Sequence, residues 1–321
     1  MPNITEATPG AAGPSPGRVR VVIWATASAL GLVLVVLTTV FLVFSVLPSD
    51  PIRNALGVNA SEVAIAALRT ELGYDRPLPE RYARFIASAV QLDFGRSVHT
   101  RQPVRPMVIE AMGITARNGA IALGASVLVS FSLTAVAFLT NRRVERGIVF
   151  LCRVLTSVPS LIVAIVVGMM AYSLLGSFAE GGARATLGII AAIAVYPICS
   201  LAEIGVSEAA RVRHAGFVAA SRCFGMSESS IFVRCVLPVV LTSWMGQLSN
   251  LAASIIVSST VFEVVFSLPG LGNLLARAVV KNDLPVMQGI AVAIVLIFLG
   301  VDAIFDRVLL PRVAVNLKGT T

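Results

Sequence analysis

Long apolar runs alternate with short polar connections along most of this chain. Runs of a length that can cross roughly 30 Å of hydrocarbon as a helix lie at about residues 21–47, 115–140, 147–175, 185–206, 239–267 and 286–309. The pattern predicts an all-α integral membrane protein with six transmembrane helices.

The first apolar run follows Arg18 and Arg20 and resembles a signal peptide at first sight. It exceeds the 7 to 15 residues of a usual signal-peptide core, so we expect residues 18–47 to remain as the first transmembrane helix. Residues 1–17 are rich in Pro, Gly and Ala and are expected to form a disordered cytosolic tail. Residues 313–321 are expected to form a second cytosolic tail.

The arginines of alternate short connections indicate the orientation. They precede the first run, join the second to the third and the fourth to the fifth, and follow the last: Arg18, Arg20, Arg142, Arg143, Arg146, Arg211, Arg213, Arg222, Arg234, Arg307, Arg312, together with Lys318. Because positive residues collect in cytoplasmic loops, both termini are predicted to be cytosolic. The insert at 48–113, the turn near SFAEGGAR and the loop at 268–285 then lie outside.

The composition agrees with lipid as the main solvent: 56% of residues are hydrophobic, 13% are charged, and the mean hydropathy is +0.87. The net charge of +8 comes from arginines beside apolar runs, without interleaved aromatics, so nucleic acid is not an expected partner. Charges are almost absent from the middle of the runs, which weighs against an ion-coupled secondary transporter. The two histidines, His99 and His214, lie outside the apolar runs, and no metal site is expected.

One polar connection, at 207–238, is long enough to fold by itself. Residues Phe217 to Phe224 are good helix formers, and Gly225 can take a left-handed C-terminal cap. Ser227 is a candidate N-cap for a second helix that reaches Pro238. The sequence therefore predicts a short cytosolic helix, a tight turn and a second helix that leads into the bilayer.

This connection resembles the cytosolic loop of bacterial ABC-importer permeases, whose pattern is EAA, three residues, Gly, nine residues, Ile, one residue, Leu-Pro. The literal Glu208-Ala209-Ala210 is out of register, whereas counting back from Leu237-Pro238 places the pattern's glycine on Gly225. An ordinary amphipathic connector is the alternative for this loop taken alone. The loop FVAASRCFGMS is closer to the peptide-importer branch, which also lacks the EAA glutamate.

Other stretches resemble the same branch: FLVFSVLPSDPI, LGYDRPLPERY, LDFGRS, FEVVFSLPGLGNLL and NDLPVMQG. The resemblance runs from about residue 20 to 312. It departs from the family at Ser49, where glycine is usual, and before Pro311-Arg312, where an aspartate is missing.

The resemblance implies a type I ABC-importer permease fold, with a core at 114–312 that holds five helices. It also implies a loop that couples to the ATPase through Phe217, Ala220, Ser221, Arg222, Gly225, Ser227, Leu237 and Pro238. A second set would serve translocation or gating: Glu263, Pro269, Gly270, Gly272 and Asp283. Two simpler interpretations stay open, Arg222 as a charge that fixes orientation and Glu263 as a helix-end carboxylate paired with an arginine.

No residues of this chain suit ATP hydrolysis or covalent catalysis. A P-loop needs GxxxxGK[ST], and the only lysines, Lys281 and Lys318, lie in other contexts. We therefore expect no catalytic residue and no cofactor, with ATP bound by separate subunits. The resemblance implies two ABC ATPase subunits, a second similar permease chain and an extracytoplasmic peptide-binding protein. The 48–113 insert, with helix-like stretches at SEVAIAALRTEL and PERYARFIASAV, could dock that protein or cap the bundle.

The resemblance thus implies a permease subunit for di- or oligopeptides in a bacterial cytoplasmic membrane. The same machinery for nickel or another small solute is the alternative. An intramembrane enzyme is a remote one, because the runs offer no nucleophile and base at membrane depth.

Overall fold

The computed structural model describes residues 30–43, 61–71, 73–175 and 183–305, together with residues 45, 52 and 56. Within these ranges the chain is helical, apart from turns and one isolated β-bridge. A helix at Leu30–Val43 comes first. The remaining helices are α3 (Glu62–Glu71), α4 (Leu78–Gln91), α5 (Val104–Leu139), α6 (Arg142–Ser157), α7 (Ser160–Leu175), α8 (Ala183–Arg213), α9 (Gly216–Cys223), α10 (Glu228–Ile231), the π-helical turn η2 (Phe232–Val236), α11 (Leu237–Val265), α12 (Leu271–Val280) and α13 (Leu284–Asp302).

Among the described residues, four helices are long and apolar enough to cross a membrane, and a fifth span results if the bent pair α6–α7 counts as one. The prediction of an all-α membrane protein is confirmed, and a total of six spans is consistent with this set. The first predicted run is only partly described, at residues 30–43 and 45, and the predicted tails at 1–17 and 313–321 lie outside the described residues.

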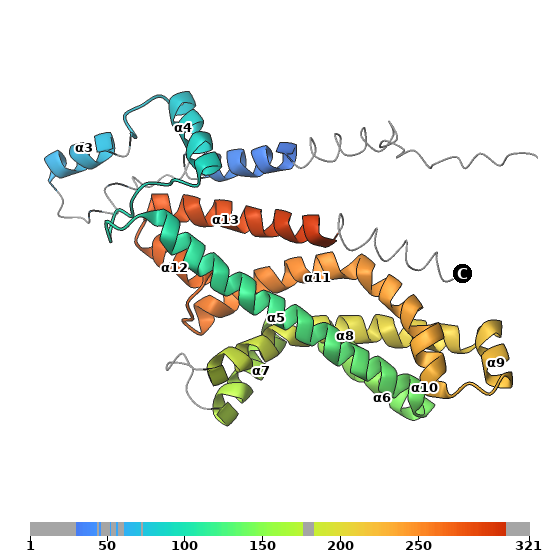
Figure 1. The fold of residues 1–321 in the computed structure, drawn as a ribbon. Helices are drawn as coiled ribbons and strands as arrows, with labels where there is room; N and C mark the ends of the chain where they lie inside the picture. The colour runs from blue at the N-terminus through green and yellow to red at the C-terminus, as the bar shows by residue number, and fades with distance from the viewer. Residues whose placement is uncertain are drawn as a thin grey trace, which may run out of the picture.

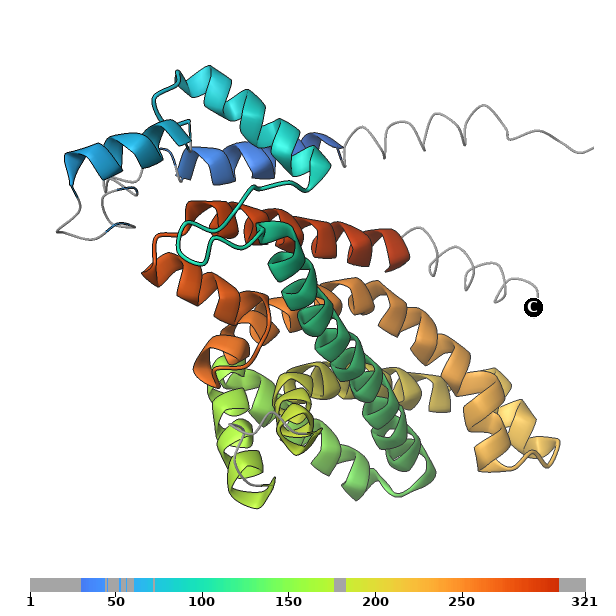
Figure 2. The ribbon, with the colours of Figure 1, turned by 60° about the vertical axis from the view of Figure 1, so that its left-hand side comes forward.

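The short elements gather at opposite ends of the long helices (Figure 1). Helices α3, α4 and α12 lie at one end, and α9 and α10 lie at the other, beside the turn between α5 and α6 (Figures 1 and 2). The stretches SEVAIAALRTEL and PERYARFIASAV form α3 and α4 as their patterns indicate. We refer to the two ends as the α12 end and the α9 end.

Helix α8 is the centre of the bundle, because it contacts α5, α6, α7 and α11. Small residues of α5, spaced four apart, line its contact with α8: Ala122, Ser126, Ser130 and Thr134 are all buried. The Ser126 hydroxyl approaches the Ala194 carbonyl oxygen (3.4 Å), and Ser130 donates to the Ile198 carbonyl (2.9 Å). Small side chains allow close approach of helix backbones in a membrane, and hydroxyls bond across the contact.

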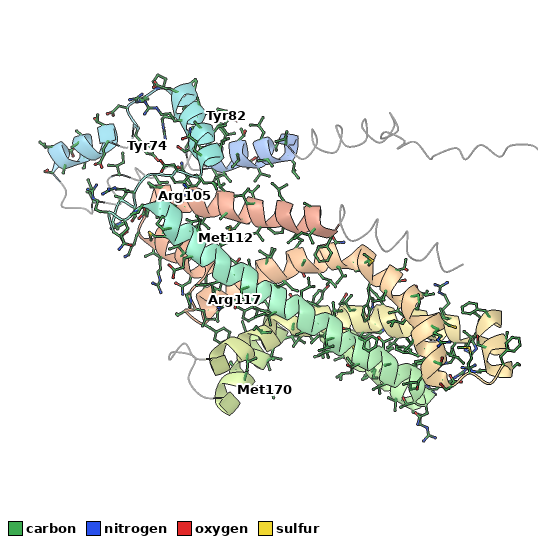
Figure 3. All side chains as sticks on the ribbon, in the orientation of Figure 1. Tyr74, Tyr82, Arg105, Met112, Arg117 and Met170 are labelled. Carbon is green, nitrogen blue, oxygen red and sulfur yellow. The ribbon has the colours of Figure 1, made fainter. Side chains whose placement is uncertain are left out.

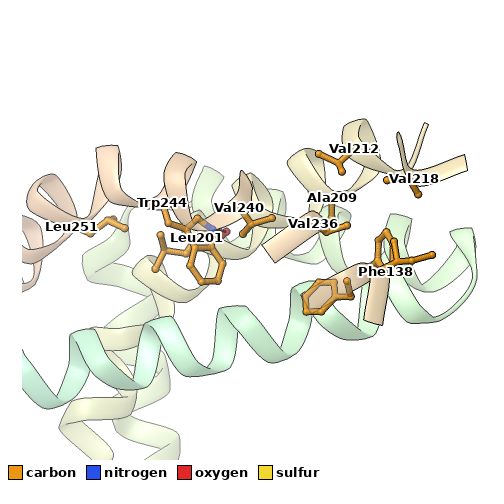
Figure 4. Packing of buried hydrophobic residues seen from close by; sticks show 11 residues of the cluster. Phe138, Leu201, Ala209, Val212, Val218, Val236, Val240, Trp244 and Leu251 are labelled. Atoms are coloured by element: carbon orange, nitrogen blue, oxygen red, sulfur yellow. Dashed lines mark hydrogen bonds between the residues drawn. The ribbon is translucent and has the colours of Figure 1, made fainter. Parts of the chain in front are cut away.

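A second apolar cluster joins α5, α8 and α11 to the α9 end (Figure 4). At its centre Trp244 is buried, and its indole nitrogen donates to the Leu201 carbonyl oxygen at 2.8 Å. This bond satisfies the one polar atom of a large apolar side chain. Val218 of α9 is fully buried in the same cluster, so the short helix is attached to the bundle by packing.

The run at 147–175 is not one straight helix, which corrects the expectation of a simple third span. Helices α6 and α7 meet at an angle of 107°, with Val158 and Pro159 between them. Pro159 has no backbone N–H to donate, and it disfavours helical dihedrals at Val158, which is extended at φ −86° and ψ 139°.

Helix α5 begins at Val104, ten residues before the start predicted for the core. Pro103 precedes the first helical residue and Pro106 falls in the first turn, where backbone N–H groups have no helical partner. At 36 residues α5 is about 54 Å long, well beyond a hydrocarbon core. Its arginines, Arg105 and Arg117, lie on the half nearest the α12 end (Figure 3).

Gly205 of α8 allows a test of how much the close packing of α5, α8 and α11 contributes to stability. An added Cβ would meet the Thr134 hydroxyl and lie 3.0 Å from the Trp244 ring. We expect Gly205→Val to destabilise the fold by about 1–3 kcal/mol through overpacking, measured as a lower melting temperature of the purified protein in detergent. Gly124→Val is the matched control, because a Cβ at Gly124 meets nothing within 4 Å. Equal melting temperatures for the two variants would contradict the packing argument.

Candidate functional site

The predicted coupling helix forms as α9, one residue earlier at each end than the sequence indicated. Its end is a Schellman-type cap: the Met226 N–H donates to the Ser221 carbonyl (3.1 Å) and the Gly225 N–H to the Arg222 carbonyl (3.0 Å). Gly225 has a left-handed φ of 77°. The structure therefore places Gly225 in the conformation that its position predicted.

The second predicted helix also begins where expected. Ser227 is the N-cap of α10, and its hydroxyl accepts from the Ser230 N–H at 3.3 Å. Arg222 and Glu228 form a two-pronged ion pair across the turn, with Nε–Oε1 at 2.7 Å and Nη2–Oε2 at 3.1 Å. The hydrogen bond to Glu228 raises the pKa of the Arg222 guanidinium. Arg222 thus links α9 to α10 across the turn, and its charge is paired.

The outer face of α9 carries an apolar stripe without a covering element in the described chain. Phe217 and Phe224 are seven residues apart, and their side chains are 53% and 86% exposed. Ala220 lies between them on the same face and is also exposed. Phe224 was absent from the set of coupling residues predicted from the sequence, although its seven-residue spacing from Phe217 was a readable signal.

Pro238 joins the loop to the bundle through a π-helical turn. It lies in the first turn of α11 and has no N–H for the helical bond to the carbonyl four residues earlier. The preceding turn, η2, widens, and the Leu237 N–H donates to the Phe232 carbonyl five residues back. Helices α10, η2 and α11 nevertheless form one candidate span from Glu228 to Val265.

At the α12 end, Glu263 connects three helices. Its side chain is 1% exposed and accepts from the Thr115 hydroxyl (2.7 Å), the Ser259 hydroxyl (3.2 Å) and the Gly272 N–H (2.7 Å). Gly272 lies in the first turn of α12, where free N–H groups favour a carboxylate. Among the described residues, its carboxylate is held by hydroxyls and a backbone N–H, and no arginine lies within ion-pair distance of it.

The turn before α12 can only approach Glu263 closely because it contains glycine. A Cβ at Gly270 would overlap the Glu263 carboxylate, and a Cβ at Gly272 would overlap the Thr260 backbone. Gly270 also has a φ of 157°. Pro269 is exposed at the tip of the turn. Both glycines of the PGLG segment are therefore required by close packing.

Asp283 holds the next turn of the chain, between α12 and α13, in the way that Glu263 holds the turn before α12. It is buried, and it accepts from the Ser97 hydroxyl and from the Val98 N–H (3.2 Å). His99 donates to the Lys281 carbonyl at 2.7 Å. The NDLP segment is thereby attached to the loop that follows α4.

A groove of about 300 Å³ lies beside the PGLG turn and is lined by Pro269, Gly270 and Asn273. Glu110 of α5 and Arg277 of α12 stand on its walls. Sequence reasoning missed both. The available signal was that Glu110 lies just before the predicted run at 115–140 and that Arg277 lies in the predicted outer loop at 268–285. Among the described residues no group of three or more His, Cys, Asp or Glu side chains could hold a metal ion.

Comparison with known proteins matches most of the chain to transport components. Residues 122–310 match the family described as "Binding-protein-dependent transport system inner membrane component", and residues 18–116 match its N-terminal region. A putative peptide transport system permease protein of Brucella abortus is 28% identical over 292 residues, covering 87% of this chain and 93% of the relative.

Two further relatives carry more specific names. A dipeptide transport system permease protein of Bacillus subtilis is 26% identical over 306 residues, which cover 92% of this chain and 97% of that protein. A glutathione transport system permease protein of Salmonella paratyphi A is 29% identical over 300 residues, which cover 86% and 93%.

Glu263 can be tested as the connection between α5, α11 and α12. Removing its carboxylate in Glu263→Ala leaves the buried Gly272 N–H without an acceptor, at a cost of about 1–3 kcal/mol. We expect a lower melting temperature and faster proteolysis within residues 266–270. Glu263→Gln keeps an acceptor oxygen and should lose less. Glu110→Ala, on the exposed groove wall, is the control, and an equal loss of stability for Glu110→Ala and Glu263→Ala would refute this role.

Proposed function

Because the chain belongs to the family of binding-protein-dependent transport system inner membrane components, we propose that it is the permease subunit of a bacterial ABC importer for di- or oligopeptides. The observation that carries this proposal is the exposed stripe of Phe217, Ala220 and Phe224 on a rigidly capped helix at one end of the bundle. Such a surface suits insertion into a partner protein. That partner would be the ATPase, and a second similar permease chain and an extracytoplasmic binding protein complete the assembly.

The proposed orientation places the α9 end in the cytosol of a bacterial cell. Arg142, Arg143 and Arg146 at the start of α6 and the arginines of the α9 loop lie at this end (Figure 1). Positive residues favour the cytosolic side. The α12 end, with α3 and α4, then faces outward and is available to a binding protein, and both chain termini are cytosolic.

Coupling would run along one continuous helical path. A displacement of α9 would reach α11 through α10 and η2, and the 38 residues from Glu228 to Val265 correspond to a helical path of about 57 Å. Glu263, near the far end of this path, is hydrogen-bonded to the start of α12. ATP hydrolysis on the partner subunits would therefore move the cytosolic end and the PGLG turn as parts of one rigid body.

The names of the relatives support a peptide as the substrate, because they include peptide, dipeptide and glutathione transport. The groove beside PGLG has an acidic wall at Glu110 and a basic wall at Arg277. These charges match the amino and carboxylate ends of a short peptide. In this proposal Pro269, Gly270 and Gly272 shape the gate, and Glu263 and Asp283 fix its position.

The orientation can be measured with reporter fusions at residues 80, 144, 225 and 276. We expect residues 144 and 225 to report from the cytosol and residues 80 and 276 from outside, because the arginine-rich connections stay inside. An external signal at residue 225 would reverse the orientation and remove the coupling proposal with it.

Gly225 allows the sharpest test of coupling. Its left-handed φ disfavours any Cβ by about 1–2 kcal/mol, whereas the surrounding space is open, with nothing within 4 Å of an added Cβ. Gly225→Val should therefore insert into the membrane normally but reorient α9, and both ATPase association and labelled-dipeptide uptake should fall together. Gly225→Asn should retain more activity, because asparagine tolerates this conformation.

Glu208→Ala is the paired control, since Glu208 belongs to the out-of-register EAA and forms an ion pair with Arg211 three residues on. It should change neither ATPase pull-down nor uptake. If Glu208→Ala uncouples transport while Gly225→Val behaves as wild type, the coupling element has been placed wrongly.

A further inference from the structure

The α9 end contains a basic cleft that the proposed transport mechanism does not use. It has a volume of about 500 Å³ and lies between the start of α6 and the end of α8. Its lining residues are Arg142, Glu145, Arg146, Ala210, Arg213 and His214. Three guanidinium groups and one imidazole therefore face a single carboxylate.

Arg213 and Glu145 neutralise each other and belong to the scaffold. Their side chains form an ion pair at 3.1 Å, and both are largely buried. Arg213 also donates to the carbonyl oxygens of Ala137 (3.2 Å) and Phe138 (2.6 Å), which lie at the end of α5. Its guanidinium is fully engaged and adds no free charge to the cleft.

Arg142 and Arg146 carry the remaining positive charge. Arg146 Nε donates to the Arg142 carbonyl at 3.2 Å, and Arg142 Nη2 lies 3.4 Å from His214 Nε2. Among the described residues, no carboxylate lies within ion-pair distance of either guanidinium. An anion with several oxygen atoms is the chemical complement of two adjacent guanidinium groups.

The same face of α6 becomes apolar immediately beyond these arginines. Phe150 and Val154 lie one and two turns after Arg146, and their side chains are 70% and 45% exposed. Arg153, at the same depth, is paired with Glu203 at 2.9 Å. A charged pocket at the end of a helix above an exposed apolar surface matches an amphiphile that has an anionic head and a hydrocarbon tail.

We propose that this cleft binds the headgroup phosphate of an anionic phospholipid, with an acyl chain along Phe150 and Val154. Basic pockets between membrane helices on the cytoplasmic side suit such headgroups. The apolar surface favours a lipid over a soluble phosphate, which has nothing to place there. The cytosolic location of this leaflet rests on the orientation given under the proposed function.

The test uses the purified full chain in nanodiscs that contain equal amounts of phosphatidylglycerol and phosphatidylcholine. Native mass spectrometry after gentle release measures which lipid stays bound. We expect the wild-type chain to retain phosphatidylglycerol. The double variant Arg142→Gln/Arg146→Gln should retain at least about tenfold less of this lipid than the wild type. Arg143→Gln/Arg234→Gln removes the same charge from exposed positions outside the cleft and should retain phosphatidylglycerol like wild type.

Three outcomes would overturn the proposal. The first is equal retention of both lipids, and the second is equal retention of phosphatidylglycerol by the two double variants. The third is displacement of the bound lipid by millimolar glycerol 3-phosphate, which would indicate a site for soluble phosphates. Melting temperatures in phosphatidylcholine discs identify a variant that fails to fold. In that case Phe150→Ser, which leaves the arginines intact, provides a second test, because it should retain less phosphatidylglycerol than the wild type. Because no ATPase or peptide is present, a negative result here is distinct from a failure of the transport proposal.

Discussion

The close contact between α5 and α8 is the constraint on which the other helices depend. No water is available in hydrocarbon to satisfy polar groups, so a helix pair must be tight and internally bonded. Ser126 and Ser130 meet both needs, because their side chains are small and their hydroxyls reach carbonyl oxygens of α8 on either side of Pro197. With α8 held there, α6, α7 and α11 pack around it.

The two ends of the bundle are built differently. At the α12 end, the buried carboxylates of Glu263 and Asp283 hold turns in place through backbone N–H groups and hydroxyls. At the α9 end, a short helix is attached by Val218 and by its own caps, and its aromatic face is exposed. Because α11 joins these ends, the proposed coupling would connect α9 to turns that are held by buried hydrogen bonds.

Local signals made much of this predictable. Ser227 and Gly225 form caps with residues close to them in the sequence, so capping rules located both ends of the turn between α9 and α10. The apolar runs indicated the membrane helices because lipid demands length and composition alone. The bend between α6 and α7 escaped prediction, since a 29-residue apolar run concealed the effect of Pro159. The early start of α5 was missed because Arg105 and Glu110 read as part of a soluble insert.

The sequence by itself determined that this chain folds as membrane helices, where its charged connections lie, and how the α9 turn is capped. These properties depend on neighbouring residues and on the solvent. Only the tertiary structure decided what Glu263 and Asp283 do, because their partners Thr115 and Ser97 lie 148 and 186 residues away along the chain. A carboxylate near a helix end can pair with an arginine, bind substrate or cap another helix. Which of these occurs depends on the donors that the packing of α5, α11 and α12 brings to it.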